Sequence, residues 1–578
     1  MITPAQRLEL SEQEILRRES LEGLKTLGIN PYPADMYDIS HSSVAIKDGF
    51  KDDEDFGDVS IAGRIMGRRI MGKASFAELM DGAGRIQLYV NRDELCPDED
   101  KTLYNTVFKK LLDIGDFIGV KGKVFRTQMG EISVEVKSLT VLSKAIRPLP
   151  VVKEKDGQVY DSFSDPELRA RQRYVDLVVN AGVKETFIKR TKIINSMRNF
   201  FNERDYLEVD TPVLQPIPGG AAARPFITHH NTLDIPLYLR IANELYLKRL
   251  IVGGFEGVYE FSRNFRNEGM DRTHNPEFTA MEIYVAYKDY NWMMDFTEAM
   301  IERAALDVNG STTIQVGDKE ISLERPFKRI SMIDSIKEHT GIDINGMDVP
   351  QLREVCDKLD VENDDTMGKG KLIDEIFGEK CEHTYIQPTF ITDYPVEMSP
   401  LCKKHRDNPE LTERFELMIN GKEIANAYSE LNDPIDQLER FQDQLKLSEN
   451  GDDEATGFID QDFVRALEYG MPPTSGMGIG IDRFVMLLTG RETIQDVLLF
   501  PQMRPEKGAE KDATAKYTAI GIPEEWVAVI QKAGYRTVAS LEEAKPGKLH
   551  QEVCGLNKKY KLGLDNPKLD TVEQWLSK

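Results

Sequence analysis

Hydrophobic and polar residues alternate with a period of two over residues 58–143. Short segments such as "VSIAGRIMGRR" and "GEISVEVKSLTVLS" are separated by turns that contain glycine. Successive side chains of a strand point to opposite faces, so each segment predicts a strand with one buried face. Several short strands at regular spacing are typical of a small barrel, and we expect an OB-fold over residues 58–147.

The expected barrel has one face suited to single-stranded bases. Its candidate residues combine cations, a ring and an amide: Arg68, Arg69, Phe76 and Gln87. Cations contact phosphates, while rings stack on bases. The alternative for Phe76 is a place in the barrel core.

Sequence patterns typical of helices occur near both ends of the chain. Ser11, followed three residues later by Glu14, forms a capping box before leucines at helical spacing, and Gly28 ends the helix. We therefore expect an N-terminal helical segment over 1–50. Residues 512–578 predict a small C-terminal helical extension, with Pro523 at one helix start and Gly534 at its end.

Residues 160–505 mix strand and helix patterns and contain a candidate hairpin, "RNFRNEGMDRTHNPEFTAMEIY" (263–284). We expect two strands joined by the loop 269–273. Alternation places Arg266 and Glu268 on one face of the first strand. In the second strand it separates a ligand-facing set from a core-facing set: Phe278, Glu282 and Tyr284 against Met281, Ile283 and Val285.

This hairpin offers groups that bind a charged ligand. An arginine such as Arg266 can fork onto a phosphate or carboxylate. Glu282 has no cation adjacent in its own strand, so we expect one from elsewhere. The alternative is a solvated strand face that carries ordinary charges.

A second hairpin is predicted around the Asn420-Gly421 turn. Pairing about this turn brings Glu416 and Glu423 to one face, where two carboxylates could bind Mg²⁺. Strict alternation would send Asn426 and Glu430 to the opposite face. If all four line one site, a bulge must lie near 424–425.

The third segment, "SGMGIGIDRFVMLLTG" (475–490), predicts a glycine-rich strand before an apolar helix. It matches neither a Walker loop nor G-x-G-x-x-G. Arg483 falls in the first turn of the helix, where the helix dipole disfavours a cation, so a negative ligand would explain it. The alternative is an arginine paired with a nearby carboxylate.

Composition narrows the class of protein. The 578 residues predict several domains, and a formal charge of −24 argues against a protein that coats nucleic acid through its overall charge, while binding through one local surface stays open. Five scattered cysteines without a C-x-x-C pair favour a reducing cytoplasm. We expect no membrane segment, since no apolar stretch reaches transmembrane length.

Three segments together resemble motifs 1, 2 and 3 of the class II aminoacyl-tRNA synthetases: the strand ending at Pro212, "FRNE…HNPEF" and "GMGIGIDR". The stretches "GKASFAELMDGAGRIQLYV", "PGGAAARPFITHHNTLD" and "EIANAYSELNDP" resemble the lysyl-tRNA synthetases in particular. The resemblance covers about residues 8–505. It implies an α+β multidomain protein with an OB-fold anticodon-binding barrel and an antiparallel catalytic sheet flanked by helices.

The resemblance also implies substrates and roles. The protein would activate L-lysine with ATP, transfer it to tRNA(Lys), use Mg²⁺ and form a homodimer through motif 1. Arg266 and Arg483 would be catalytic, and the implied ATP contacts are Arg266, Glu268, His274, Asn275, Phe278, Glu416, Glu423 and Arg483. Glu416 and Glu423 would hold the metal. The implied lysine contacts are Gly220, Glu244, Arg266, Glu282, Tyr284, Asn426 and Glu430.

Two arguments bear on the substrates. Glu282 and Glu430 are two carboxylates that need one buried cation, which an ε-ammonium supplies, whereas an aspartate or asparagine pocket would present a cation or amide donor. In the barrel, Phe76 would stack on anticodon bases and Gln87 would hydrogen-bond to them. Ser138 departs from the family, which often has glutamate there.

Two other functions stay open. A ligase that lysylates proteins would lack the OB barrel, which the sequence predicts. A non-catalytic tRNA-binding scaffold would have lost motif residues, and Arg266, Glu416, Glu423 and Arg483 are present. The C-terminal extension resembles a helix–hairpin–helix nucleic-acid module, but a docking or stabilising role is the alternative that we favour.

Overall fold

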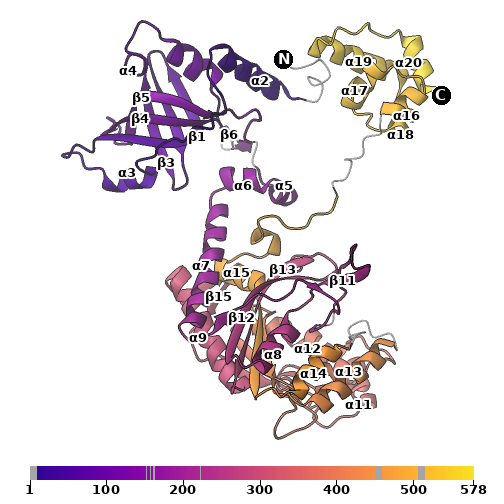
Figure 1. The fold of residues 1–578 in the computed structure, drawn as a ribbon. Helices are drawn as coiled ribbons and strands as arrows, with labels where there is room; N and C mark the ends of the chain where they lie inside the picture. The colour runs from indigo at the N-terminus through magenta and orange to yellow at the C-terminus, as the bar shows by residue number, and fades with distance from the viewer. Residues whose placement is uncertain are drawn as a thin grey trace. The chain divides into compact units, whose positions relative to one another are not determined.

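The computed structural model describes residues 10–150, 153–155, 158–160, 163–221, 223–449, 459–505 and 514–577. The chain divides into two compact units, Met1–Ser162 with Arg504–Lys578, and Phe163–Met503 (Figure 1). No helix of the described residues is long and apolar enough to cross a membrane. The domain limits expected from the sequence stay predictions.

The first unit contains the expected barrel. Its strands are β1 (Asp58–Met71), β2 (Ala74–Met80), β3 (Arg85–Asn91), β4 (Phe117–Arg126) and β5 (Ile132–Ser143). They close in the order β1-β2-β3-β5-β4 around a core of aliphatic side chains, which confirms the OB-fold. The other elements are α2 (Glu12–Thr26), α3 (Ser43–Gly49), α4 (Arg92–Leu95), the π-helix η1 (Leu103–Leu111), β6 (Lys153–Lys155) and β7 (Gln158–Tyr160).

Helix α2 begins as the sequence predicts. The Ser11 side chain accepts a hydrogen bond from the Glu14 amide, and the Glu14 carboxylate accepts one from the Ser11 amide. Gly28, with φ of 75°, follows its end. Residues 1–9 of the expected helix lie outside the described residues.

The second unit is built on an eight-stranded sheet in the order β16-β17-β18-β19-β20-β13-β12-β8. The pairs β16–β17 and β12–β8 are parallel and the others antiparallel. The bounds are β8 (Leu207–Glu208), β12 (Gly257–Phe265), β13 (Glu277–Ala286), β16 (Lys328–Ser331), β17 (Thr389–Thr392), β18 (Arg414–Ile419), β19 (Lys422–Ser429) and β20 (Thr474–Gly480). Smaller sheets pair β9 (Leu214–Gln215), β10 (Ile227–His230) and β11 (Ile235–Leu239), and β14 (Thr313–Val316) with β15 (Lys319–Ser322).

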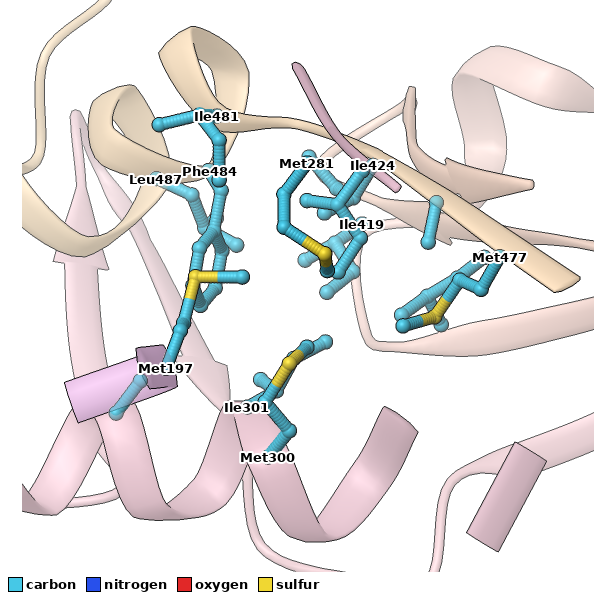
Figure 2. Packing of buried hydrophobic residues seen from close by; sticks show 14 of the residues in the cluster. Met197, Met281, Met300, Ile301, Ile419, Ile424, Met477, Ile481, Phe484 and Leu487 are labelled. Carbon is cyan, nitrogen blue, oxygen red and sulfur yellow. The ribbon is translucent and has the colours of Figure 1, made fainter. Parts of the chain in front are cut away.

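The main core lies on one face of this sheet. Helices α7 (Val183–Asn202), α9 (Tyr290–Asn309) and α15 (Ile481–Thr489) cover it. Figure 2 shows how side chains from these helices meet those from the strands: Met197, Met300, Ile301, Phe484 and Leu487 against Met281, Ile419, Ile424 and Met477. Burying this face leaves the opposite face of the same strands to carry polar residues.

Two further groups of helices complete the unit. Helix α8 (Glu244–Val252) contacts β12 and β13 and shares a second cluster with α13 (Pro434–Glu449) and α14 (Gln461–Glu468). A third cluster holds α10 (Met332–Thr340), α11 (Val349–Leu359) and α12 (Lys369–Lys380). The remaining elements are α5 (Pro166–Arg171), α6 (Arg173–Val179) and the 3₁₀ turns η2 (Glu382–Thr384), η3 (Val396–Met398) and η4 (Ile494–Asp496).

The C-terminal residues form a small helical module with its own core, which includes Trp526 and Trp575. Its helices are α16 (Thr514–Ala519), α17 (Glu524–Lys532), α18 (Val538–Glu542), α19 (Pro546–Tyr560) and α20 (Leu569–Leu576). Pro523 is the N-cap of α17, and Gly534, with φ of 108°, follows its C-cap. This confirms the helical extension.

Two strands are shorter than expected. The strand expected to run to Pro212 is reduced to β8, which ends at Glu208. β12 ends at Phe265, although the Arg266 amide still donates to the Pro276 carbonyl, 2.8 Å away. Arg266 and Glu268 therefore do not share a strand face, because Glu268 already lies in the connecting loop.

Candidate active site

Three polar residues and a glycine form a row across four neighbouring strands. Strand register pairs Glu282 on β13 with Gly478 on β20, Gly478 with Asn426 on β19, and Asn426 with Glu416 on β18. Paired residues point to the same face of a sheet. The two hairpins and the glycine strand, distant in sequence, thus contribute to one surface.

The glycines of β20 make room in this surface. A Cβ at Gly476 would lie 2.2 Å from Glu430 Oε1 and 2.3 Å from Tyr284 Cε1. At Gly478 the nearest atom would be Glu282 Cγ, at 3.8 Å. The glycine strand therefore admits side chains of its neighbours, and Gly476 does so with no space to spare.

The predicted bulge in the second hairpin is present. Asn420 and Gly421 both have positive φ, and the register shifts so that Leu417 pairs with Ala425 but Met418 with Glu423. Ile424 is the extra residue, which lies between positions 423 and 425. Because of this shift, Glu423 and Asn426 lie on the same face as Glu416, as expected.

Beside the row lies a cluster of buried carboxylates around an internal lysine, which we call the acidic pocket: Glu244, Glu282, Glu430 and Lys248. Lys248 Nζ lies 2.5 Å from Glu244 Oε1 and forms a second ion pair with Glu430. Tyr428 donates a 2.6 Å hydrogen bond to Glu244 Oε1. Gly220, at φ of 89°, lies against Glu244, since a Cβ there would be 3.4 Å from the Glu244 Cβ.

Glu282 is the third carboxylate of this cluster, and it is buried. Its carboxylate accepts a 2.9 Å hydrogen bond from the Tyr284 hydroxyl. Burial, with the negative charge of Glu244 as a further cause, raises the pKa of Glu282 to about 8. Within the described part of the chain, Glu282 has no ion-pair partner.

The expectation that a bound ammonium neutralises Glu282 and Glu430 stays a prediction, and the structure adds an internal cation beside them. Glu430 already has a cation of the protein, Lys248. The reason is helix geometry: Lys248 is four residues from Glu244, so the two side chains share one face of α8.

Arg266 is half-buried, and its guanidinium carbon lies 5.1 Å from the centre of the Phe278 ring. Its Nε is buried without a hydrogen-bond partner among the described residues. Burial lowers the pKa of Arg266, while Glu268, Glu423 and Glu282 raise it. A buried donor without an acceptor is costly, so this guanidinium is suited to an anionic ligand.

The loop after β12 connects to the third segment through His274. His274 Nδ1 lies 2.7 Å from Asp271 Oδ2, and its Nε2 lies 2.9 Å from Arg483 Nη2. Arg483 also donates to the Glu423 carbonyl at 3.1 Å and lies 3.5 Å from the Glu423 carboxylate. Arg483 stands in the first turn of α15, as predicted, and it does have a carboxylate partner.

Asn275 is engaged within the protein. Its Nδ2 donates to the Glu277 carbonyl and its Oδ1 accepts from the Gln502 amide. Both polar atoms of the side chain thus fix the loop.

Glu416 and Glu423 fit a divalent cation by their chemistry. Burial, then the charge of Glu423, raises the pKa of Glu416 to about 8, although Arg414 Nη2 lies 2.6 Å away. A cation between the two would relieve this repulsion. No group of three or more His, Cys, Asp or Glu side chains among the described residues is arranged to hold a metal.

The barrel presents three of its four candidate residues on one face. Arg69 pairs with Phe76, Phe76 with Tyr89, and Gln87 Nε2 donates to Ser133 Oγ at 3.0 Å. Phe76 is half-buried and outside the barrel core, so the core alternative is wrong. The rings of Phe76, Tyr89 and Phe125 form a cluster, with centres 5.3 and 5.8 Å apart.

Arg68 does not join them. It pairs with the buried Ala77 and donates to the Phe108 carbonyl. Successive strand residues point to opposite faces, so Arg68 and Arg69 cannot share one. Ser138 is exposed on β5 opposite Lys121.

Sequence reasoning missed Lys248, Tyr428 and Arg414 in the second unit, and Tyr89 and Phe125 in the barrel. The four-residue spacing of Glu244 and Lys248 was the one available signal for Lys248. Alternation along 85–91 could have placed Tyr89 beside Gln87.

Comparison with known proteins agrees with this architecture. Residues 165–504 match the family model of class II tRNA synthetases (D, K and N), 59–142 match the OB-fold nucleic acid binding domain, and 513–578 match a domain of unknown function (DUF4332). A lysine–tRNA ligase of Porphyromonas gingivalis is 72% identical over 570 residues, 98% of each chain. One of Azobacteroides pseudotrichonymphae is 70% identical over 498 residues, 86% of this chain and 99% of the relative. The chain belongs to the class II tRNA synthetases and, within them, to the lysine–tRNA ligase family.

Proposed function

We propose that this protein activates L-lysine with ATP and transfers it to the 3′ end of tRNA(Lys). A lysine carboxylate oxygen attacks the α-phosphorus of ATP, the bond to the β-phosphate oxygen breaks, and lysyl-adenylate and pyrophosphate form. The terminal ribose hydroxyl of tRNA then attacks the acyl carbon, and AMP leaves. Both steps depend on orientation and charge stabilisation, without a covalent enzyme intermediate.

The observation that carries the proposal is the neighbourhood of Arg266 and the acidic pocket. Arg266 has a buried Nε without a partner, and the charge of Glu282 influences its pKa. A zwitterionic amino acid with a second ammonium matches this arrangement: carboxylate toward Arg266, α-ammonium toward Gly220 and Glu244, ε-ammonium toward Glu282 and Glu430. Tyr284 and Asn426 enclose the side chain.

ATP occupies the neighbouring part of the surface. Phe278 and Arg483 sandwich adenine, while Glu268 and His274 contact the nucleotide from the loop. Asn275 holds that loop in place through its hydrogen bonds to Glu277 and Gln502. Glu416 and Glu423 would hold Mg²⁺, which supplies neutralisation of the phosphate charge. Arg414, hydrogen-bonded to both Glu416 and Asn426, keeps those side chains in place.

The barrel binds the anticodon in this proposal. Phe76 and Gln87, with Arg69, offer stacking, hydrogen bonding and charge on one face. Arg68 is expected to affect anticodon binding only indirectly, through its hydrogen bond to the Phe108 carbonyl. A homodimer is supported by exposed apolar side chains around the motif 1 region: Leu207, Val213, Leu214 and Ile235. A cytoplasmic location is part of the same proposal and is supported by the five free cysteines.

The test is ATP–pyrophosphate exchange with each of the twenty amino acids, without tRNA. Exchange with lysine alone is the expected result. Exchange with aspartate or asparagine would mean that the pocket is misassigned within the same family. If no amino acid supports exchange, the non-catalytic scaffold replaces the enzyme, and lysine transfer to proteins instead of tRNA(Lys) would favour the protein ligase.

A further inference from the structure

The least accessible charge beside the row is Lys248. Its side chain is fully buried, as is that of Glu430, and its Nζ bridges Glu430 and Glu244. The rings of Tyr428, Phe463 and Tyr284 surround it at 5.4, 5.8 and 6.0 Å. This ammonium therefore has no contact with solvent and interacts with carboxylates and ring faces.

The two carboxylates that it bridges come from different ends of the proposed lysine site. Glu244 stands at the start of α8 beside Gly220, at the α-amino end. Glu430 follows β19 and lies against Gly476 and Tyr284, at the side-chain end. A single cation thus fixes the spacing between the two subsites.

Charge balance points the same way. When ionised, Glu244, Glu282 and Glu430 carry three negative charges, and Lys248 reduces the total to two. Free lysine carries two ammonium groups, and its carboxylate faces Arg266. With Lys248 present, the bound amino acid leaves no uncompensated carboxylate in a dry pocket.

We propose that Lys248 is a positioning residue for amino-acid recognition. It holds the carboxylates of Glu244 and Glu430 at a fixed spacing, and it makes the net charge of the pocket match a substrate with two ammonium groups. The inference rests on the proposed function and deepens it. A purely structural ion pair is a poor alternative, because burying a full charge costs more than an apolar side chain of the same size. Met at position 248 would pack the site without that cost.

The titratable groups that face Lys248 come from several elements. They are Glu244 on α8, Glu282 and Tyr284 on β13, Tyr428 on β19, and Glu430 and Cys402 beyond the strands. Burial alone would lower the pKa of Lys248, but Glu244 and Glu430 raise it above its usual value. Lys248 therefore stays cationic while the carboxylates around it titrate.

The test compares K248M with the parent chain by pyrophosphate exchange across pH 6–9. We expect KM for lysine to rise at least about thirtyfold, since one partner of a buried charge pair is removed. KM for ATP should change far less. The apparent pKa in the lysine KM profile should move upward, because the carboxylates lose their cation.

Lys144 provides a matched control. Its side chain is fully buried directly after barrel strand β5, and its Nζ lies 2.5 Å from Asp113 and 2.9 Å from Asp116. K144M removes an equivalent ion pair outside the second unit and should leave the lysine KM and its pH profile unchanged. K248Q serves as a second variant that keeps hydrogen-bonding capacity and removes the charge.

A lysine KM within threefold of the parent in K248M or K248Q would overturn the proposal. So would equal rises in the KM values for lysine and ATP, which indicate general distortion. If neither variant folds, Lys248 is required for folding and the proposal also fails. Failure of the proposed function is distinguishable, since the parent chain itself would then show no lysine-dependent exchange.

Discussion

The substitution Gly476→Ala tests the tightest contact in the pocket. The added Cβ would lie 2.2 Å from Glu430 Oε1 and 2.3 Å from Tyr284 Cε1, whereas carbon contacts are most favourable at 3.5–4.0 Å. Each neighbour must move by about 1 Å or more, because β20 is held by backbone pairing on both sides. Overpacking of this kind costs about 1–3 kcal/mol.

Two measurements follow from this geometry. The thermal transition of the second unit should fall by about 2–6 °C in the substrate-free protein. KM for lysine should rise by about 10²-fold, since a shift of 1 Å in a positioning group can cost that much. KM for ATP serves as the internal reference and should change by a much smaller factor.

Gly478→Ala is the matched control for stability. The added Cβ would lie 3.8 Å from Glu282 Cγ, which is an ordinary contact, and position 478 is on the same face of β20 as position 476. We expect its melting temperature to stay close to that of the parent. Equal melting temperatures for all three proteins, together with an unchanged lysine KM in G476A, would refute the packing described for Glu430 and Tyr284.

Three other predictions concern pH, the barrel and the C-terminal module. Because burial and Glu244 raise the pKa of Glu282 to about 8, the folded protein binds more protons than the unfolded chain between pH 4.5 and 8. Without substrate, the melting temperature should therefore fall as pH rises through this window. KM for lysine should fall between pH 6 and 8 as Glu282 ionises, so a flat KM profile would contradict the pocket assignment. Phe76→Ala should raise KM for tRNA at least about tenfold, from the loss of one stacking contact, and far more than KM for ATP in aminoacylation assays; Arg68→Ala, on the opposite face, is the comparison. Truncation after residue 505 should raise KM for tRNA with pyrophosphate exchange intact if the module aids tRNA binding, and unchanged tRNA kinetics would leave docking or stabilisation as its role.

The hairpins were predictable because their signals are local. The Asn420-Gly421 turn sets the register of its strands, and the requirement that Glu423 and Asn426 share a face located the bulge at Ile424. The capping box at Ser11 and the alternation of the barrel strands are equally local. Each of these features depends on residues that are close together in the sequence.

The features that were missed depend on tertiary contacts. The spacing of Glu244 and Lys248 indicates a shared helix face, but nothing in α8 tells that Glu430 meets that face. Beyond the end of β12 at Phe265, long-range hydrogen bonds hold the loop: the Asn267 amide donates to the Arg224 carbonyl, and the Ile494 amide donates to the Arg272 carbonyl. Such contacts join segments far apart in sequence, which periodicity does not report.

The strand order of the large sheet has a consequence for biosynthesis. β13 ends at Ala286, but its neighbour β20 begins only at Thr474, so the chain between them must be made before the sheet can close. At about 5–20 residues per second, the ribosome needs roughly 10–40 s for that stretch. During this time β13 is an edge strand that carries Met281 and Ile283 without their final cover, which exposes the nascent chain to edge-to-edge association. A nascent chain is therefore expected to need chaperone protection until β20 emerges, and to gain the ability to activate an amino acid only after that point.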